Sequence, residues 1–270
     1  MAISTAAKSP AAEFERRSKR AEVLARDAEA AREPLLFASA LCREQSTAAL
    51  AIEEAHLSRP LTGRLADDAV RILPLLGSAV RVAAERGPEE LAGQARHRQL
   101  EEGSVASNRL MVMWSGDSNA REDYLSRAML RPYLEVLRAY GVSPDRLHRP
   151  GHCPFCGGAP LVSSRKEMRD SNAAARMLHC GFCGCEWTAV RGSCPSCTEA
   201  DPAKLPIFTS DAHPLVRIEA CETCGRYVKS VDLTQDARMI PEIDDLVSLS
   251  MDLWAVEQGL TRIEPGLAGM

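Results

Sequence analysis

Residues 151–157 read GHCPFCG, and residues 192–198, which begin 41 positions further on, read GSCPSCT. The turns CGFCG at 180–184 and CETCG at 221–225 are separated by the same 41 positions. Eight of the ten cysteines therefore form four Cys-x-x-Cys pairs: Cys153/Cys156, Cys180/Cys183, Cys194/Cys197 and Cys221/Cys224. The constant spacing indicates a tandem duplication of one unit, and each copy carries four thiols.

Four thiolates on two Cys-x-x-Cys turns are typical of a tetrahedral site for a soft metal ion. The two pairs of each copy are separated by 23 residues, which is room for a strand, a turn and a returning strand. We expect each copy to bind one ion, because the duplication makes pairing within a copy the simpler arrangement. An interleaved pairing, as in cross-braced zinc modules, is the alternative. The two ions are predicted to be iron or zinc, since the same four sulfurs hold either.

A glycine after the second cysteine lets the chain leave such a turn at positive φ. Gly157, Gly184 and Gly225 supply it, whereas the third turn has Thr198 at this position. The remaining cysteines, Cys42 and Cys185, have no partner at the repeating distance. Cys42 is predicted to be a small buried residue of a helix, and Cys185 an extra thiol that binds no metal.

Cysteine pairs can also serve as structural disulfides or as redox centres. Structural disulfides are common in small secreted domains, but the first residues lack the apolar segment of a signal peptide. Thioredoxin-type redox pairs are disfavoured, because four pairs in duplicated register lie outside a βαβ pattern. Reduced metal thiolates without an export signal predict a cytoplasmic protein.

Composition and periodicity indicate two parts, and the 270 residues leave room for both. The net charge of −4 argues against a general polyanion binder, and no apolar run approaches the ~20 residues that span a membrane. Residues 1–140 are predicted to form a helical domain, followed by a proline-bearing linker over 141–152. The expected helices are 11–32, 35–56, 65–86 with a kink at Pro74, 88–100, 105–114 and 120–140.

Beyond the linker, short β segments alternate with the cysteine turns. They are expected at 161–165, 176–179, 186–191, 207–209, 215–219 and 227–231, within a first Cys₄ module over 153–191 and a second over 192–232. A C-terminal helix within 239–262 is predicted to pack back on the domains through Ile243, Leu246, Leu249, Leu253 and Val256. Asp244 and Asp245 fall in its first turn, where the helix dipole favours carboxylates; contact with a partner is the alternative. The predicted fold class is α+β.

The cysteine-rich region resembles a known family. The motifs that carry the resemblance are CPFCG at 153–157, LHCGFCGCEW at 178–187, RGSCPSC at 191–197, RIEACETCGRYVK at 217–229 and PEIDDLVSL at 241–249. Together they are similar to formate dehydrogenase accessory proteins of the FdhE type.

The resemblance implies a helical N-terminal domain followed by two tandem rubredoxin-like, zinc-ribbon-like Cys₄ modules that hold iron or zinc. It also implies an assembly chaperone that binds the catalytic subunit of respiratory formate dehydrogenase in the cytoplasm, before export. Such a protein is not expected to be an enzyme, and the chain shows no nucleophile–base set, phosphate-binding glycine loop or paired-carboxylate site.

Two other functions compete with this hypothesis. A rubredoxin-like redox protein could pass electrons to a maturing partner. A zinc-ribbon nucleic-acid binder is disfavoured, because residues 141–232 hold eleven Lys/Arg against ten Asp/Glu and form no basic stripe. Arg191, Arg217 and Arg226 could reach acidic groups on a client or form solvated surface.

Overall fold

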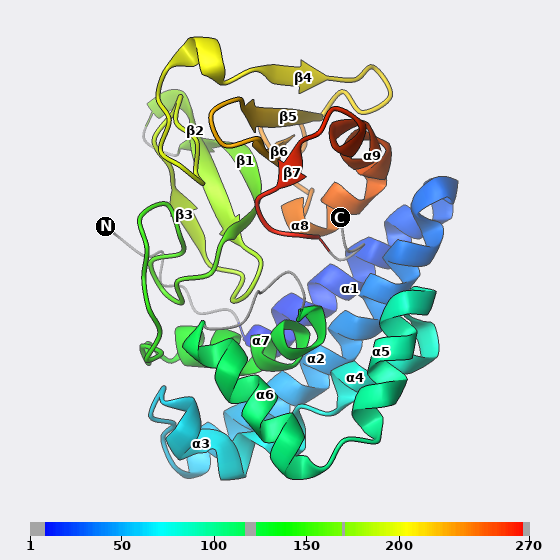
Figure 1. Ribbon diagram of the computed structural model, residues 1–270, viewed down its shortest axis with the longest axis vertical. Helices are drawn as coiled ribbons and strands as arrows, with labels where there is room; N and C mark the ends of the chain where they lie inside the picture. The colour runs from blue at the N-terminus through cyan, green and yellow to red at the C-terminus, as the bar shows by residue number, and fades with distance from the viewer. Residues whose placement is uncertain (1–8, 117–122, 169–170, 267–270) are drawn as a thin grey trace. The chain divides into compact units, whose positions relative to one another are not determined.

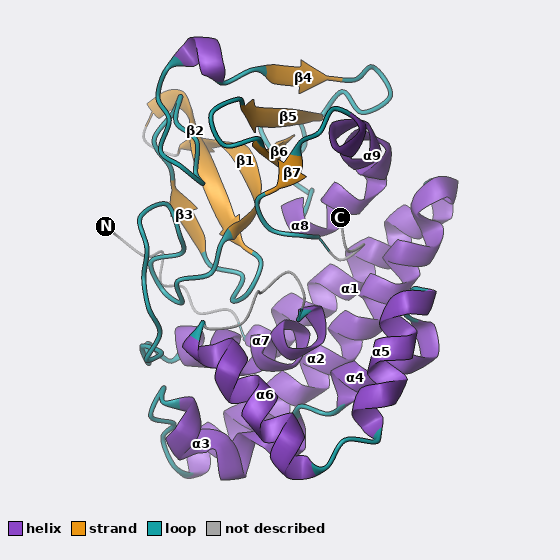
Figure 2. Cartoon of the chain, in the orientation of Figure 1, coloured by secondary structure: helices purple, strands orange, loops and turns teal. Residues whose placement is uncertain are grey.

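The computed structural model describes residues 9–116, 123–168 and 171–266. It divides the chain into two compact units. The first unit contains the chain up to Asp27 and residues Arg32–Leu147, and the second contains Ala28–Ala31 and the chain from His148 onward. Helices make up the first unit, and all the strands of the described residues belong to the second (Figures 1 and 2).

The first unit is a bundle of seven helices within the described residues. They are α1 (Pro10–Asp27), α2 (Arg32–Ser58), α3 (Leu65–Ile72), α4 (Ser78–Arg86), α5 (Glu89–Gln99), α6 (Gly103–Ser115) and α7 (Tyr124–Ala139). Helix α7 is buried along much of its length and packs against α1, α2, α4 and α6. Glu135 at its centre is fully buried and accepts hydrogen bonds from Arg17 of α1 at 2.9 Å and from Arg131 at 2.8 Å.

Two of the expected helices differ from the structure. The predicted helix over 65–86 is not merely kinked but broken into α3, the short 3₁₀ turn η2 (Leu73–Leu75) and α4, because Pro74 cannot donate a backbone hydrogen bond. The helix predicted from residue 120 begins at Tyr124, after Asp123 caps it by accepting from the Ser126 N–H at 3.0 Å. Residues 120–122 lie outside the described ranges.

The segment predicted as a linker is held to the helical unit over its first half. Asp145 accepts a hydrogen bond from the Trp114 indole at 2.6 Å, and its own N–H donates to the Gly63 carbonyl at 3.0 Å. Arg146 donates to the Trp114 carbonyl. The boundary between the two units therefore falls after Leu147, inside the predicted linker.

In the second unit the two copies of the duplication form one sheet. The first copy contributes β1 (Pro160–Met168), β2 (Ser171–Cys180) and β3 (Glu186–Thr188), and the second β4 (Ile207–Thr209), β5 (Val216–Cys221) and β6 (Arg226–Asp232). Each set is antiparallel, and the strand order is β3-β2-β1-β6-β5-β4. Strands β1 and β6 pair in parallel, from Val162 opposite Lys229 to Arg165 opposite Asp232. The sheet therefore continues across the boundary between the copies.

The C-terminal segment packs on this sheet, but not as one helix. It consists of α8 (Pro241–Asp244), the 3₁₀ turn η4 (Asp245–Ser248) and α9 (Leu249–Glu257), followed by β7 (Thr261–Arg262), which pairs with β6. Met251 and Ala255 of α9 join the core formed by the sheet. The predicted apolar stripe is therefore wrong in its second half, and Leu253 and Val256 are 54% and 56% exposed. The tighter winding of η4 changes the phase of the helix, so spacings counted from Ile243 do not extend into α9.

Four charged side chains are buried between this segment and the sheet. Lys229 of β6 and Arg262 of β7 face Asp245 and Asp252, and none of the four is more than 4% exposed. Lys229 lies 3.1 Å from Asp245, and Arg262 lies 2.7 Å from Asp245 and 3.2 Å from Asp252. Tyr227 donates to Asp252 at 2.8 Å. We call the four charged residues Lys229, Arg262, Asp245 and Asp252 the latch.

The burial of Asp244 and Asp245 excludes the alternative role of this acidic pair, which was contact with a partner. Asp245 is enclosed in it, and Asp244, which is 3% exposed, accepts a hydrogen bond from the Ile240 N–H at 2.7 Å. Neither carboxylate is available to a partner on the surface, so both serve the fold. Across the described ranges, the helices also fall short of the length and apolarity that crossing a bilayer requires.

Candidate metal centres

The first sulfur group lies between the two cysteine turns of the first copy. Its sulfurs all lie within 4.8 Å of one another, and all four cysteines are buried: Cys153, Cys156, Cys180 and Cys183. Cys153 Sγ lies 3.6 Å from Cys183 Sγ, and Cys156 Sγ lies 3.5 Å from Cys180 Sγ.

The second sulfur group repeats this arrangement in the second copy, with Cys194, Cys197, Cys221 and Cys224. Cys194 Sγ lies 3.8 Å from Cys224 Sγ, and Cys197 Sγ lies 3.6 Å from Cys221 Sγ. The two groups differ in their access to solvent, because Cys197 is exposed and Cys224 is partly exposed. The sulfurs thus gather within each copy, and the interleaved pairing is not the arrangement found.

The sulfur positions suit a bound ion. A tetrahedral ion with metal–sulfur distances of ~2.3 Å places its sulfurs about 3.8 Å apart. The distances of 3.5 to 3.8 Å found here agree with this value. They are far longer than the ~2.05 Å of a disulfide bond. Each group could therefore hold one metal ion.

All four cysteine turns have the same backbone geometry. In each, the residue after the second cysteine donates its N–H to the carbonyl of the first, from Gly157, Gly184, Thr198 and Gly225 at 2.9 to 3.2 Å. These four residues all have positive φ, between 63° and 70°. Glycine adopts this conformation without strain, whereas the β-branched Thr198 does not. The third turn therefore keeps the shared geometry at the cost of backbone strain.

Cys185 lies beside the first sulfur group, where its thiol interacts with Cys153 and Cys183, but it is not one of the four cysteines that form the group. Its carbonyl accepts the Cys180 N–H at 2.9 Å, as the Gly158 carbonyl accepts from Cys153 and the Glu199 carbonyl from Cys194, both at 2.8 Å. The residues that correspond to Cys185 in the first and third turns are therefore Gly158 and Glu199, neither of which is a cysteine. Its thiol donates to the Glu186 carbonyl at 3.7 Å. Cys42 is buried in α2, in the other unit.

The thiols of the first group depend strongly on one another. Hydrogen bonds from Cys156, Cys180 and Cys183 lower the pKa of Cys153 to about 4. Burial raises the pKa of Cys156 and of Cys183 well above the ordinary value. Without an ion Cys156 and Cys183 therefore keep their protons, and an ion must displace them to bind all four sulfurs.

Two histidines beside the turns are held by other groups. His179 pairs its Nε2 with the Ser164 hydroxyl at 2.8 Å, and burial lowers its pKa. His152 Nδ1 lies 3.2 Å from the Pro150 carbonyl. Neither belongs to a sulfur group in the described residues.

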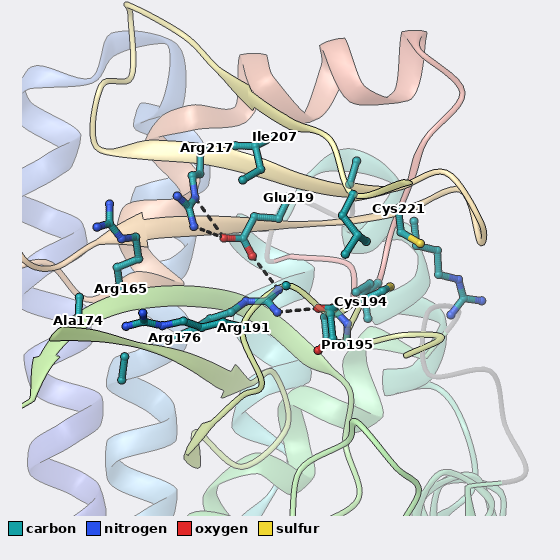
Figure 3. A pocket seen from close by; sticks show the side chains of 17 residues that line it. Arg165, Ala174, Arg176, Arg191, Cys194, Pro195, Ile207, Arg217, Glu219 and Cys221 are labelled. Atoms are coloured by element: carbon teal, nitrogen blue, oxygen red, sulfur yellow. Dashed lines mark hydrogen bonds and ion pairs between the residues drawn. The ribbon is translucent and has the colours of Figure 1, made fainter. Parts of the chain in front are cut away.

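A pocket of about 460 Å³ opens beside the second sulfur group. Cys194 and Cys221 form part of its wall (Figure 3). Five arginines also line it: Arg165, Arg176, Arg191, Arg217 and Arg226. The sequence alone points only to Arg191, Arg217 and Arg226. The missed pair, Arg165 and Arg176, face each other in the β1–β2 register, which becomes visible only once the strands are aligned.

Comparison with known proteins gives a consistent result. The family domain "FdhE, central domain" matches residues 152–191, and "FdhE, C-terminal domain" matches residues 193–267. The FdhE homolog of Aquifex aeolicus is 30% identical over 195 residues, which cover 70% of this chain and 67% of that protein. The homolog of Pseudomonas putida is 32% identical over 155 residues, 52% of this chain and 48% of the relative.

The chain thus spans about two thirds of the first of these relatives and about half of the second. The crystal structure of the FdhE protein from Pseudomonas aeruginosa has the same fold, with a TM-score of 0.69 over 94% of both chains at 22% identity. The helical first unit, the sheet-containing second unit and the C-terminal helices are therefore a shared architecture. The chain belongs to the FdhE family of formate dehydrogenase accessory proteins.

Proposed function

We propose that this protein is an assembly chaperone for a respiratory formate dehydrogenase and binds its catalytic subunit in the cytoplasm before export. Membership of the FdhE family supports this role. The observation that carries the proposal is the pair of four-sulfur groups in one continuous sheet. Such a sheet offers a preformed surface, so that a client does not bear the entropic cost of ordering its receptor. The protein acts by binding and has no turnover of its own.

The eight cysteines of the two sulfur groups are proposed as the ligands of two metal ions, iron or zinc. A bound ion supplies a cross-link between two turns whose cysteines lie 24 to 30 positions apart. The chain's own part is to hold the sulfurs in place, through the four repeated N–H to carbonyl bonds. Since such turns do not form a site in the unfolded chain, the binding energy of the ion is also folding energy of the second unit.

A second candidate function is electron transfer to the maturing enzyme. The exposure of Cys197 favours it, because electrons pass most readily through a cluster ligand that reaches the surface. This candidate requires iron in the second group, and ferric thiolate is red whereas zinc thiolate is colourless. Reversible bleaching by a reductant, in protein purified from its own host, would support it. Zinc in both groups under those conditions would eliminate it.

The maturation role is tested in a strain that lacks this gene and any second copy. We expect the formate dehydrogenase polypeptide to be made but respiratory formate oxidation to be lost, and the wild-type gene to restore it. Cys185→Ser, which alters a thiol outside the sulfur groups, should restore oxidation as well, whereas Cys180→Ser should not. Normal formate oxidation in the deletion strain would refute the assignment.

Binding of the client is tested separately. A tagged chain should recover the formate dehydrogenase catalytic subunit from a cytoplasmic extract, and Cys180→Ser should recover less. A deletion strain that loses formate oxidation, together with a tagged chain that recovers no catalytic subunit, would retain the maturation role and eliminate direct binding.

A further inference from the structure

The arginine-rich pocket lies on one face of the sheet. Arg217 and Glu219 alternate along β5 with Val216 and Ile218, which point into the core under the C-terminal helices. Arg217 and Glu219 therefore point to the opposite face. Figure 3 shows Arg165, Arg176 and Arg217 at one end of the pocket near Glu219, with Cys194 and Cys221 toward the other.

The charges at this end do not balance. Glu219 is shared, with Arg176 at 2.7 Å and Arg217 at 2.5 Å. Its two carboxylate oxygens are thus each paired with one guanidinium group. Arg165 pairs with Asp232 at 3.0 Å.

Arg191, the fourth guanidinium of this group, forms no hydrogen bond or ion pair with the part of the chain that the structure describes. Its side chain is exposed. Leaving Arg226 aside, four guanidinium groups thus face two carboxylates at this end of the pocket, and an excess of two positive charges remains in a protein whose net charge is −4.

Arg176 also has an unused donor. Its side chain is buried, at 9% exposure, and its Nη1 donates to the Ser193 carbonyl at 2.7 Å. Its Nε is buried and has no hydrogen-bond partner among the described residues. A buried donor without a partner is costly, and a bound water or ion is one way in which such a group is satisfied.

We propose that this pocket binds the dianionic phosphoryl group of a small molecule. A phosphoryl group carries a charge of about −1.5 to −2 at pH 7 and three acceptor oxygens, which matches two excess charges and several convergent donors. Arginine forks match its oxygens geometrically. The position between Arg176 and Arg217 that a ligand carboxylate would take is already occupied by the side chain of Glu219. The volume is that of a small-molecule site, so the ligand is larger than a phosphate ion.

The site does not depend on the client role, and its test uses the purified full-length protein with its metal ions. Phenyl phosphate is the probe, benzoate is the matched monoanion, and inorganic phosphate tests the phosphoryl group without an organic part. Binding is measured by isothermal titration calorimetry at low ionic strength. We expect saturable binding of one phenyl phosphate, with weaker binding of inorganic phosphate and weaker still of benzoate.

Two variants test the site in opposite directions. Arg191→Gln should weaken phenyl phosphate binding about tenfold or more, because it removes one charge-assisted donor. Glu219→Gln should strengthen binding, since it removes a negative charge from the pocket and frees the guanidinium groups of Arg176 and Arg217 from their ion pairs. The control is Arg149→Gln, an exposed arginine of the same unit that does not line the pocket, which should leave the affinity within about twofold. Loss of folding cannot produce a gain and a loss at one site.

Several results would overturn the proposal. One is the absence of saturable phenyl phosphate binding in the millimolar range. Another is an equal loss of affinity in Arg191→Gln and Arg149→Gln, which would indicate general charge attraction. Tighter binding of benzoate, or of a short acidic peptide, would assign the pocket to carboxylates.

Discussion

Replacing Lys229 by methionine tests the latch that fastens the C-terminal segment to the sheet. The ammonium group is 0% exposed and donates to the Asp245 carbonyl at 2.8 Å and to the Ser248 hydroxyl at 3.0 Å. It lies 3.1 Å from the Asp245 carboxylate and contacts Asp252 as well. With Arg262 it balances the two carboxylates. Methionine fills a similar volume, so the variant chiefly leaves one buried negative charge without compensation.

The magnitude follows from that charge. Removing one partner of a buried ion pair costs about 3–5 kcal/mol of unfolding free energy. A domain has about 5–15 kcal/mol in total, so the variant loses a large fraction of it. At roughly 4 °C per kcal/mol for a unit of this size, the Tm should fall by about 10 to 20 °C.

Urea unfolding measures the change, and amide hydrogen exchange over β6 and 241–262 shows where the fold loosens. The control is Lys166→Met, which breaks the half-exposed pair with Glu186 and should cost less than about 1 kcal/mol. Adding Asp252→Asn to Lys229→Met restores charge balance and should recover part of the loss. Equal costs for the two lysine variants, or a double variant less stable than Lys229→Met, would refute the reasoning.

Four further predictions follow from particular residues. Burial alone would raise the pKa of Asp245, but Arg262 and Lys229 lower it. Its stabilisation is therefore complete above the unfolded pKa of about 3.9 and is lost as the pH falls through the lower folded pKa. The urea midpoint should drop in this range, and Asp245→Asn should flatten the drop; an unchanged profile would contradict it. Cys180→Ser should lose one metal ion and Cys185→Ser none, which metal analysis of the two purified variants would measure. Loss of metal from Cys185→Ser would show that Cys185 is a ligand. A chelator should remove metal in two steps, first from the group with the exposed Cys197. Removal in a single step would show that the two groups release metal equally readily. Thr198→Gly should raise the free energy of unfolding, measured with urea, by about 0.5–1 kcal/mol, since relief of about 1–2 kcal/mol of backbone strain exceeds the added chain entropy. Destabilisation would show that the hydrogen bond from the Thr198 hydroxyl to the Cys197 carbonyl matters more.

The sulfur groups were predictable because their information is local. Two Cys-x-x-Cys turns at a fixed spacing, three of the four with a glycine after the second cysteine, specify a geometry that hardly depends on the rest of the chain. Thr198 illustrates this, since it takes the glycine conformation without being glycine. Most of the strands were also predictable, because the 23 residues between the two turns of each copy leave room for a strand, a turn and a returning strand.

The union of the two copies was not predictable in the same way. The pairing of β1 with β6 places Val162 opposite Lys229, and these residues are far apart in sequence. The sequence of a strand does not indicate which other strand will pair with its edge. The latch was missed for a different reason. A lysine in a strand and an arginine near the end of the chain read as surface residues, because charged side chains are rarely fully buried. Only their mutual contact makes their burial favourable.

The position of the latch has a consequence for synthesis of the protein. Strand β6 leaves the ribosome before its neighbour β7. The latch around Lys229 is therefore incomplete until both Asp252 and Arg262 have been synthesised. Until residue 262 has emerged, the sheet can form while the face that carries Lys229 stays open to water. The nascent chain therefore passes through a state with the cysteine turns already built and the apolar underside uncovered, and this is the stage at which holding factors and proteases compete for it.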